Sequence, residues 1–327
     1  MSRKKQNLSP DTILKNYWRD NNQFADLFNA VLFEGKQIIF PNELEDIDTE
    51  ESSVMEHRGY AESIKASRDN IKISKRSTSF DAEFVMLGIE SQEHVHYAMP
   101  MRVMGYDYGI YKKQYDSNAK KYQTVEGLSE SEYLSRMKKS DRFTPVITVV
   151  VYYGGSPWDG ATTLHGMLNI PEHIKPFVND YKMLLVEAKQ NNLQFHNTNN
   201  MALFDLLQII LEKDLATDEA KKKVIKYVEK YNVDKNVIMT VASATNRNID
   251  YSTLARKGDF TMHTLFDEIE KQAELSGELK GELKGIQALI ESLQEMDVPY
   301  TKTQNQIMVK FSLSEDNAQD YMRKFWK

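Results

Sequence analysis

The sequence predicts an α/β protein with a central mixed sheet flanked by helices and a helical C-terminal extension. Two continuous apolar runs, 84–89 and 145–153, have the length expected of buried central strands. Apolar residues at helical spacing precede the first run and dominate the chain after about residue 200. Gly 14 and Pro 8 among 327 residues are too few for a collagen-like or a Pro/Gly-rich disordered chain.

The N-terminal elements follow from local patterns. A helix is predicted over 11–34, where apolar side chains recur at steps of three and four. The acidic stretch 43–56 has no periodicity and is predicted to be a loop or a frayed helix. The short apolar run 37–40 is expected to be the first strand, and two further strands are expected around 66–73 and 82–93. Pro100 then begins a helix, because proline is favoured in the first helical turn.

After the helix that begins at Pro100, strands and helices are again predicted from local patterns. The polar segment 116–142 is predicted to be an insertion or a helical arm. The run 145–153, PVITVVVYY, is apolar and β-branched, so it predicts a strand buried on both faces. A further strand is expected over 182–187, and helical spacing follows. These patterns predict a core over 1–200 with a helical extension over 201–270.

The last residues, 271–327, differ in composition. The repeat GELKGELKG places its glycines on one face of a polar helix and predicts a linker. An apolar stripe over 286–293 and the N-cap residue Ser314 predict two short helices after it. The apolar side chains of the tail are expected to pack on each other or on a second copy. The small helical unit they form is expected to assist either a homodimer through the C-terminal helices or the docking of DNA.

Charge and composition limit the function classes. Lys+Arg 42 against Asp+Glu 48 gives a net charge of −6, so any polyanion site must be local. The absence of cysteine excludes disulfides, thiolate nucleophiles and Cys-based metal sites. No run approaches the length of a membrane span, and no apolar segment follows the basic N-terminus. We therefore expect a soluble, cytoplasmic protein with no membrane partner.

Acidic residues at the predicted strand ends suggest a metal site. Asp69 and Glu90 lie on neighbouring predicted strands, and Mg²⁺ prefers hard oxygen ligands. Glu90 and Gln92 are two residues apart, so a strand places them on the same side. The pattern is an aspartate followed about twenty residues later by Glu-x-Gln.

These residues belong to longer runs through which the sequence resembles the recombination-promoting nuclease or putative transposase family of the PD-(D/E)XK nuclease superfamily. The similar runs are Phe24–Asn29, Arg68–Asp69, Leu87–Gln92, His96–Arg102, Val150–Gly154 and Pro157–Trp158. The resemblance covers roughly residues 10 to 270. It implies a restriction-endonuclease-like core ordered as helix, three strands, helix and strand, which matches the order predicted above.

The resemblance also implies a chemistry. Asp69, Glu90 and the main-chain carbonyl of Ser91 would bind Mg²⁺, with Mn²⁺ as a possible substitute, for the hydrolysis of DNA. Gln92 takes the position of the superfamily lysine, and Asp26 matches the acidic residue of the first helix. A neutral amide cannot supply the positive charge of a lysine. Catalysis would therefore depend more on the metal.

Local charge is compatible with a DNA partner. Residues 58–76 include six basic and two acidic residues, and residues 112–142 include eight basic and five acidic ones. Both segments flank the predicted site, and contacts to phosphates supply affinity without sequence information. Arg68, Lys72 and Arg102 are the predicted nucleic-acid contacts.

Other interpretations remain open. The fold could serve as a DNA- or protein-binding module with negligible cleavage, or as a structural assembly protein built on its C-terminal helices. Asp69 and Glu90 could be strand-end carboxylates that pair with neighbouring basic residues. His94 and His96 have a spacing that can bind zinc, although no third ligand is at motif distance. The Tyr- and Met-rich stretch 97–111 is expected to be core rather than a platform on which bases stack.

Overall fold

The chain forms two compact units, Met1–Met262 and His263–Lys327, in a computed structural model. The structure describes residues 9–47, 53–57, 60–64, 70–74, 85–190, 192–212, 218–245 and 261–326. The sequence patterns placed a boundary near residue 270, and the two units divide at Met262.

Two helices occupy the region where one was predicted. α1 spans Pro10–Arg19 and α2 spans Asn21–Phe33. They separate at Asp20, whose backbone is extended and whose carboxylate accepts hydrogen bonds from the backbone N–H groups of Asn22 and Gln23. Asp20 therefore caps α2 and ends α1 in one residue. The apolar periodicity continues through the break, which is why the sequence predicted a single helix.

The first unit contains a five-stranded mixed sheet, so the α/β class is confirmed. Its strands are β1 (Leu44–Asp46), β4 (Asn70–Ser74), β5 (Val85–Gln92), β6 (Val146–Tyr152) and β7 (Leu184–Glu187), in that spatial order. The β1–β4 and β4–β5 pairs are antiparallel, and the β5–β6 and β6–β7 pairs are parallel. β2 (Ser53–His57) and β3 (Tyr60–Ile64) form a separate antiparallel pair. β5 is thus the strand at which the pairing changes from antiparallel to parallel.

The apolar run 37–40 is not a strand, and the first strand of the sheet is β1. The prediction of a loop or frayed helix over 43–56 is wrong for two parts of that segment, which form β1 and β2. β1 is a three-residue strand, with Leu44 buried and Glu45 and Asp46 exposed. A short charged edge strand carries no apolar alternation, so its ladder with β4 determines its structure.

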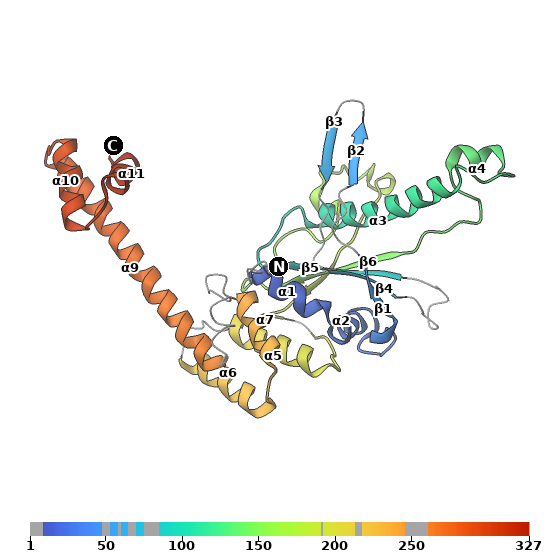
Figure 1. The fold of residues 1–327 in the computed structure, drawn as a ribbon, viewed down its shortest axis with the longest axis horizontal. Coiled ribbons are helices and arrows are strands. Elements are labelled where there is room, and N and C mark those ends of the chain that lie inside the picture. The colour runs from blue at the N-terminus through green and yellow to red at the C-terminus, as the bar shows by residue number, and fades with distance from the viewer. Residues whose placement is uncertain are drawn as a thin grey trace, which may run out of the picture. The chain divides into compact units, whose positions relative to one another are not determined.

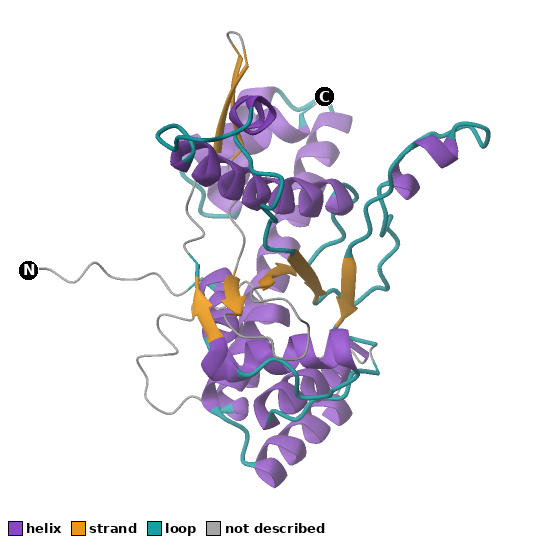
Figure 2. Ribbon diagram, turned by 90° about the vertical axis from the view of Figure 1, so that its right-hand side faces the viewer, coloured by secondary structure: helices purple, strands orange, loops and turns teal. Residues whose placement is uncertain are grey.

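Helices cover both faces of the sheet (Figure 1). α3 (Met99–Lys121) lies on one face, where Met99 and Val103 pack against Val150 of β6. α1 and α2 lie on the other face, and the Trp18 indole N–H donates to the Tyr153 hydroxyl at 2.9 Å. Pro100 is in the first turn of α3, as predicted. Figure 2 shows the same layers, with the strands in orange.

The remaining helices of the first unit are mostly short. α4 spans Glu130–Ser135, and the 3-10 helices η1, η2 and η3 span Pro41–Glu43, His165–Met167 and Lys175–Phe177. The helices after the sheet are α5 (Thr198–Glu212), α6 (Asp218–Tyr231) and α7 (Lys235–Thr245). α7 packs against α1 and α5, so these later helices belong to the same unit as the sheet.

The C-terminal unit has its own core. α9 (Met262–Glu295) includes the glycine repeat within one helix, and α10 (Tyr300–Lys310) and α11 (Glu315–Phe325) follow. Ser314 caps α11, as predicted. The core residues come from all three helices: Ile286, Ile290, Ile307, Ala318 and Met322. In the part of the chain that the structure describes, no helix is long and apolar enough to cross a membrane.

Truncation of Ile307 to alanine should loosen this small core. Ile307 is fully buried, so Ile307→Ala is expected to destabilise the C-terminal unit by about 2–5 kcal/mol. Hydrogen exchange should accelerate in α10 and α11 while the amides of β5 and β6 keep their protection. Val309→Ala is the matched control, because Val309 is 81% exposed on the same helix. Equal exchange in the two variants would contradict this assignment of the core.

Candidate functional site

Glu90 and Gln92 lie at the carboxyl end of β5, where the antiparallel half of the sheet meets the parallel half. The two side chains are on the same face, since the Gln92 amide donates to Glu90 Oε1 at 3.1 Å. Gln92 pairs with Tyr152 of β6, and Tyr152 pairs with Glu187 of β7. Polar residues therefore follow one another across the carboxyl edge of three parallel strands.

Two side chains from α3 reach the Glu90 carboxylate. Arg102 Nη2 lies 3.0 Å from Glu90 Oε1, and the Tyr106 hydroxyl donates to the same oxygen at 3.3 Å. Arg102 Nε also donates to the Tyr106 hydroxyl at 3.2 Å. Because Arg102 and Tyr106 are four residues apart on one helix, they present adjacent groups to Glu90. Arg102, predicted as a DNA contact, is an ion-pair partner of Glu90 with a one-third exposed side chain.

Burial and charge act together on the groups around Glu90. Burial, followed by the Glu90 carboxylate, raises the pKa of the Tyr106 hydroxyl. Burial, followed by the Arg102 guanidinium, lowers the pKa of His96. The His96 Nδ1 atom is buried and has no hydrogen-bond partner among the described residues. His96 is therefore a neutral imidazole near neutral pH.

This pKa shift gives a testable pH dependence. The unperturbed pKa of histidine is about 6.5, so His96 should take up its proton only at lower pH. Arg102→Met removes the neighbouring positive charge, and the pKa of His96 should rise in an NMR titration of the imidazole. Lys120→Met, at the other end of α3, is the control and should leave the value unchanged. A pKa of His96 that does not respond to Arg102→Met would contradict the proximity of the two groups.

Asp69 and Arg68 lie outside the described residues. β4 begins at the next residue, Asn70, which pairs with Ile89, the neighbour of Glu90. Of the predicted metal ligands, the structure therefore places Glu90 and Ser91 together at one strand end. Within the described ranges, no three His, Cys, Asp or Glu side chains form a cluster that could hold a metal ion. His94 and His96 are therefore not joined there by a third such side chain.

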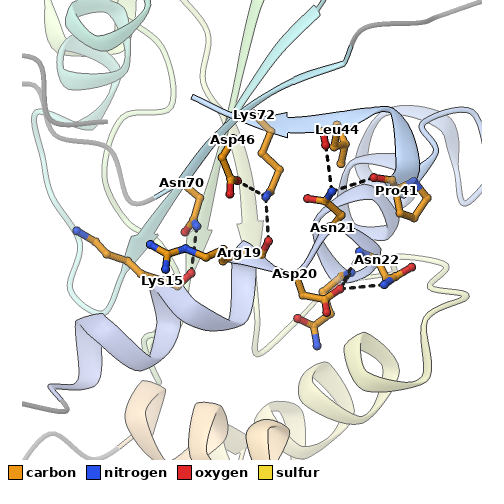
Figure 3. Close-up of polar contacts among 11 residues, drawn as sticks. Lys15, Arg19, Asp20, Asn21, Asn22, Pro41, Leu44, Asp46, Asn70 and Lys72 are labelled. Atoms are coloured by element: carbon orange, nitrogen blue, oxygen red, sulfur yellow. Dashed lines mark hydrogen bonds and ion pairs between the residues drawn. The ribbon is translucent and has the colours of Figure 1, made fainter. Parts of the chain in front are cut away.

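Lys72 lies inside the protein, in contrast to its predicted role as a DNA contact (Figure 3). Its side chain is 1% exposed, and its ammonium donates to the Arg19 carbonyl at 2.9 Å and to Asp46 at 2.5 Å. The same ammonium lies 5.4 Å from the centre of the Phe24 ring. A phosphate contact would require Lys72 to leave all of these partners. The alternating pattern of β4 could not show this, because Asp46 and Arg19 come from other elements.

Asp26 connects helices rather than presenting a carboxylate to solvent. It is buried in α2, where its oxygens accept the His196 backbone N–H at 2.8 Å and the Asn200 amide at 2.9 Å. Asn200 also donates to the Gln23 carbonyl and accepts the Tyr17 hydroxyl. Both oxygens of Asp26, which was predicted to be catalytic, are thus used to hold α2 against the start of α5.

The sequence patterns missed several residues of this edge. Glu187 ends β7 and accepts the Trp158 backbone N–H at 2.9 Å, and Tyr152 packs edge-to-face on the Trp158 ring. A glutamate at the end of a second predicted parallel strand was a usable signal, because the carboxyl ends of parallel strands share one edge. Tyr106 could have been found from its helical spacing to Arg102.

The prediction that 97–111 is core is wrong for part of that stretch. Met99, Val103 and Tyr106 are buried, but Tyr97, Met101 and Tyr108 are largely exposed. The helix has one apolar face against the sheet and a second apolar strip on its outer side.

Comparison with protein-family models, with curated protein sequences and with solved structures found no match. The nuclease resemblance of the motifs stays a prediction. The chemistry of this edge therefore depends on the residues described above.

Proposed function

We propose that the chain is a Mg²⁺-dependent DNA endonuclease on a restriction-endonuclease-like core, acting in recombination or transposition. The observation that carries the proposal is Glu90, a buried carboxylate on the central strand. Its Oε1 atom accepts hydrogen bonds from both Arg102 and Gln92. In open α/β sheets, ligands bind outside the carboxyl ends of the parallel strands. Glu90 lies near the carboxyl end of β5, the first of the three parallel strands β5, β6 and β7.

The order of elements supports the same proposal. α1 and α2 precede three successive antiparallel strands of the main sheet, β1, β4 and β5. α3 follows, and β6 then adds in parallel to β5. This is the order that the nuclease resemblance implies, with the Glu-x-Gln sequence on the third strand.

The donor set suits Mg²⁺. The residues that would hold the ion are Glu90 and the Ser91 carbonyl, together with Asp69, and all supply hard oxygen atoms. Mg²⁺ sites commonly use one or two carboxylates and complete their coordination with water and substrate phosphate. When bound, the ion would polarise the scissile phosphate and lower the pKa of its water. Tyr106 orients the Glu90 carboxylate from α3.

Arg102 can provide the positive charge that Gln92 lacks. Its guanidinium and the Gln92 amide donate to the same Glu90 oxygen, at 3.0 and 3.1 Å. A guanidinium keeps its charge at all physiological pH values and can also bind phosphate. We assign Arg102 as a positioning residue that holds Glu90 and places a cation at the strand end.

The proposal is tested by incubating purified protein with supercoiled plasmid in Mg²⁺, Mn²⁺ or EDTA. We expect nicked or linear DNA with either metal and none with EDTA. Calorimetric titration with Mn²⁺ should show binding to the wild type that Asp69→Asn weakens by more than tenfold. Cleavage that persists in EDTA, or unchanged binding in the variant, would place the chemistry elsewhere.

Substitution of Gln92 separates its role from that of the metal ligands. Gln92→Lys restores the superfamily lysine and should keep or increase the cleavage rate. Gln92→Ala removes a hydrogen bond to Glu90 and should lower the rate by about 10-fold while Mn²⁺ binding persists. Single-turnover cleavage and calorimetry measure the two effects. A Gln92→Ala enzyme that cuts at the wild-type rate would remove this side chain from the mechanism.

A second candidate function is a DNA-binding module without cleavage. The ion pair between Arg102 and Glu90 favours it, because it satisfies the carboxylate in the absence of a metal. The neutral Gln92 favours it as well. DNA binding in EDTA, together with no cleavage and no calorimetric signal with Mn²⁺, would support this candidate over the nuclease.

A further inference from the structure

An arm that extends from the sheet carries a surface that the candidate site does not use. We define the arm as residues 99–142, which contain α3, α4 and their connecting segments (Figure 1). Between Lys112 and Arg142 it has eight lysines and arginines and five acids, whereas the whole chain has a net charge of −6. The arm is thus a local basic segment in an acidic protein.

Two of the acids on the arm are engaged by its backbone. Glu132 accepts the N–H groups of Ser129 and Lys139, each at 3.1 Å. Asp141 accepts the N–H of Lys138 at 2.8 Å. These backbone hydrogen bonds hold the pKa of Glu132 and the pKa of Asp141 below their usual values. Both carboxylates are therefore directed at the turns between α3 and β6.

Lys112 is paired with Asp116, but other basic side chains of the arm are exposed or lie over a ring. Lys120, Lys121 and Lys139 are exposed. Tyr122 is buried, and the ammonium groups of Lys121 and Lys138 lie 5.4 and 5.5 Å from the centre of its ring. Tyr122 thus holds two cations near one another, and phosphates spaced along a strand can contact such a group.

Large apolar side chains are also exposed along α3 and α4 and just before α3. Met101 and Tyr108 are 51% and 48% exposed, and their spacing of seven residues places them on one face of α3. Tyr97, before the helix, is 66% exposed. On α4, Tyr133 is 54% exposed, and the Arg136 guanidinium lies 4.8 Å from the centre of its ring.

We propose that the arm binds single-stranded nucleic acid. Unpaired bases stack on exposed aromatic rings while the backbone follows basic side chains. A duplex keeps its bases inside and would use the cations but not the rings. The combination of Tyr133 and Tyr108 with the lysines around Tyr122 therefore favours a single strand.

Single-stranded DNA would then be the substrate class of the proposed nuclease. Only this step, in which the bound strand is also the strand that is cut, rests on the proposed function. α3 is part of the arm and carries Arg102 near its start and basic residues near its end, so the arm itself reaches Glu90. A single strand bound along α3 would lead from the basic end of the arm to the candidate site.

Fluorescence anisotropy with a labelled 20-nucleotide DNA, single-stranded or annealed to its complement, tests the proposal in EDTA. The full chain should bind the single strand more tightly. Tyr133→Ala should weaken that binding about tenfold, and Tyr133→Phe should retain it. Phe177→Ala is the control, because Phe177 is 85% exposed on η3, outside the arm. Equal affinity for both DNAs, or an unaffected Tyr133→Ala variant, would overturn the proposal.

Salt dependence tests the basic residues separately. The double variant Lys120→Ala, Lys139→Ala should reduce the slope of log affinity against log salt by about 1.4, because each lost phosphate contact on a single strand accounts for about 0.7. Lys222→Ala, Lys226→Ala removes two exposed lysines from α6 and should leave the slope unchanged. A slope that responds equally to both pairs would overturn the assignment to the arm.

Failure of this inference can be distinguished from failure of the nuclease proposal. Binding in EDTA requires neither metal nor cleavage. A chain that binds the single strand through Tyr133 but does not cut any DNA supports the arm and removes the nuclease. A chain that cuts DNA at the same rate with Tyr133→Ala, and binds it equally well, retains the nuclease and overturns the arm.

Discussion

Replacement of Glu90 by glutamine is expected to abolish metal-dependent cleavage, with a rate loss of at least about 100-fold. The amide has nearly the same shape as the carboxylate, but it cannot supply a charged oxygen ligand to Mg²⁺. Glu90→Gln also removes the counter-charge of Arg102, which lies 3.0 Å away. Single-turnover cleavage in Mg²⁺ and Mn²⁺ measures the loss, and calorimetry with Mn²⁺ shows whether it arises from metal binding.

Glu172→Gln provides the matched control for this experiment. The same chemical change is made at a side chain that is 87% exposed, so cleavage should stay at the wild-type rate. Thermal unfolding of both variants shows whether the fold is retained. A folded Glu90→Gln protein that cuts as fast as the wild type would exclude Glu90 from the chemistry.

Asp26→Ala is expected to lower the free energy of unfolding by about 3 kcal/mol. The substitution removes the acceptor of the partly buried His196 backbone N–H and of one N–H of the buried Asn200 amide, and an unsatisfied buried donor costs about 1–3 kcal/mol. Urea denaturation followed by circular dichroism measures the change. Asp11→Ala is the control, since Asp11 is exposed in the first turn of α1.

The same variant distinguishes a structural Asp26 from a catalytic one. If Asp26 acts only as a link between α2 and α5, the cleavage rate per folded molecule should stay within a few-fold of the wild type at low temperature. A folded Asp26→Ala protein with full stability and no cleavage would instead restore the catalytic role predicted from the sequence.

The elements with strong local patterns were predictable. The run PVITVVVYY forms β6, and Pro100 is in the first turn of α3. β1 was not predictable, because three residues with two exposed acids carry no periodicity. The break between α1 and α2 depends on the capping geometry of Asp20, which the continuous apolar pattern conceals.

In the candidate site, too, one part was predictable from the sequence and another was not. The two-residue period of a strand was enough to place Glu90 and Gln92 on one side. The contacts of Arg102 with Glu90, and of Lys72 with Asp46, join elements that are far apart in the chain. A charged side chain looks the same in the sequence whether it faces solvent or an internal partner, so the burial of Lys72 could only come from the packing of α1 on the sheet.

That packing has a mechanical consequence. On β4, Asn70 donates to the Lys15 carbonyl and Lys72 donates to the Arg19 carbonyl (Figure 3). Two residues of a strand advance by about 6.6 Å, and four residues of a helix advance by about 6 Å. The spacing of the two donor residues along β4 is therefore close to the spacing of the two acceptor residues along α1, which is about one helical turn. A slip by one residue would misalign both bonds at once, so α1 and β4 should move as a single rigid body.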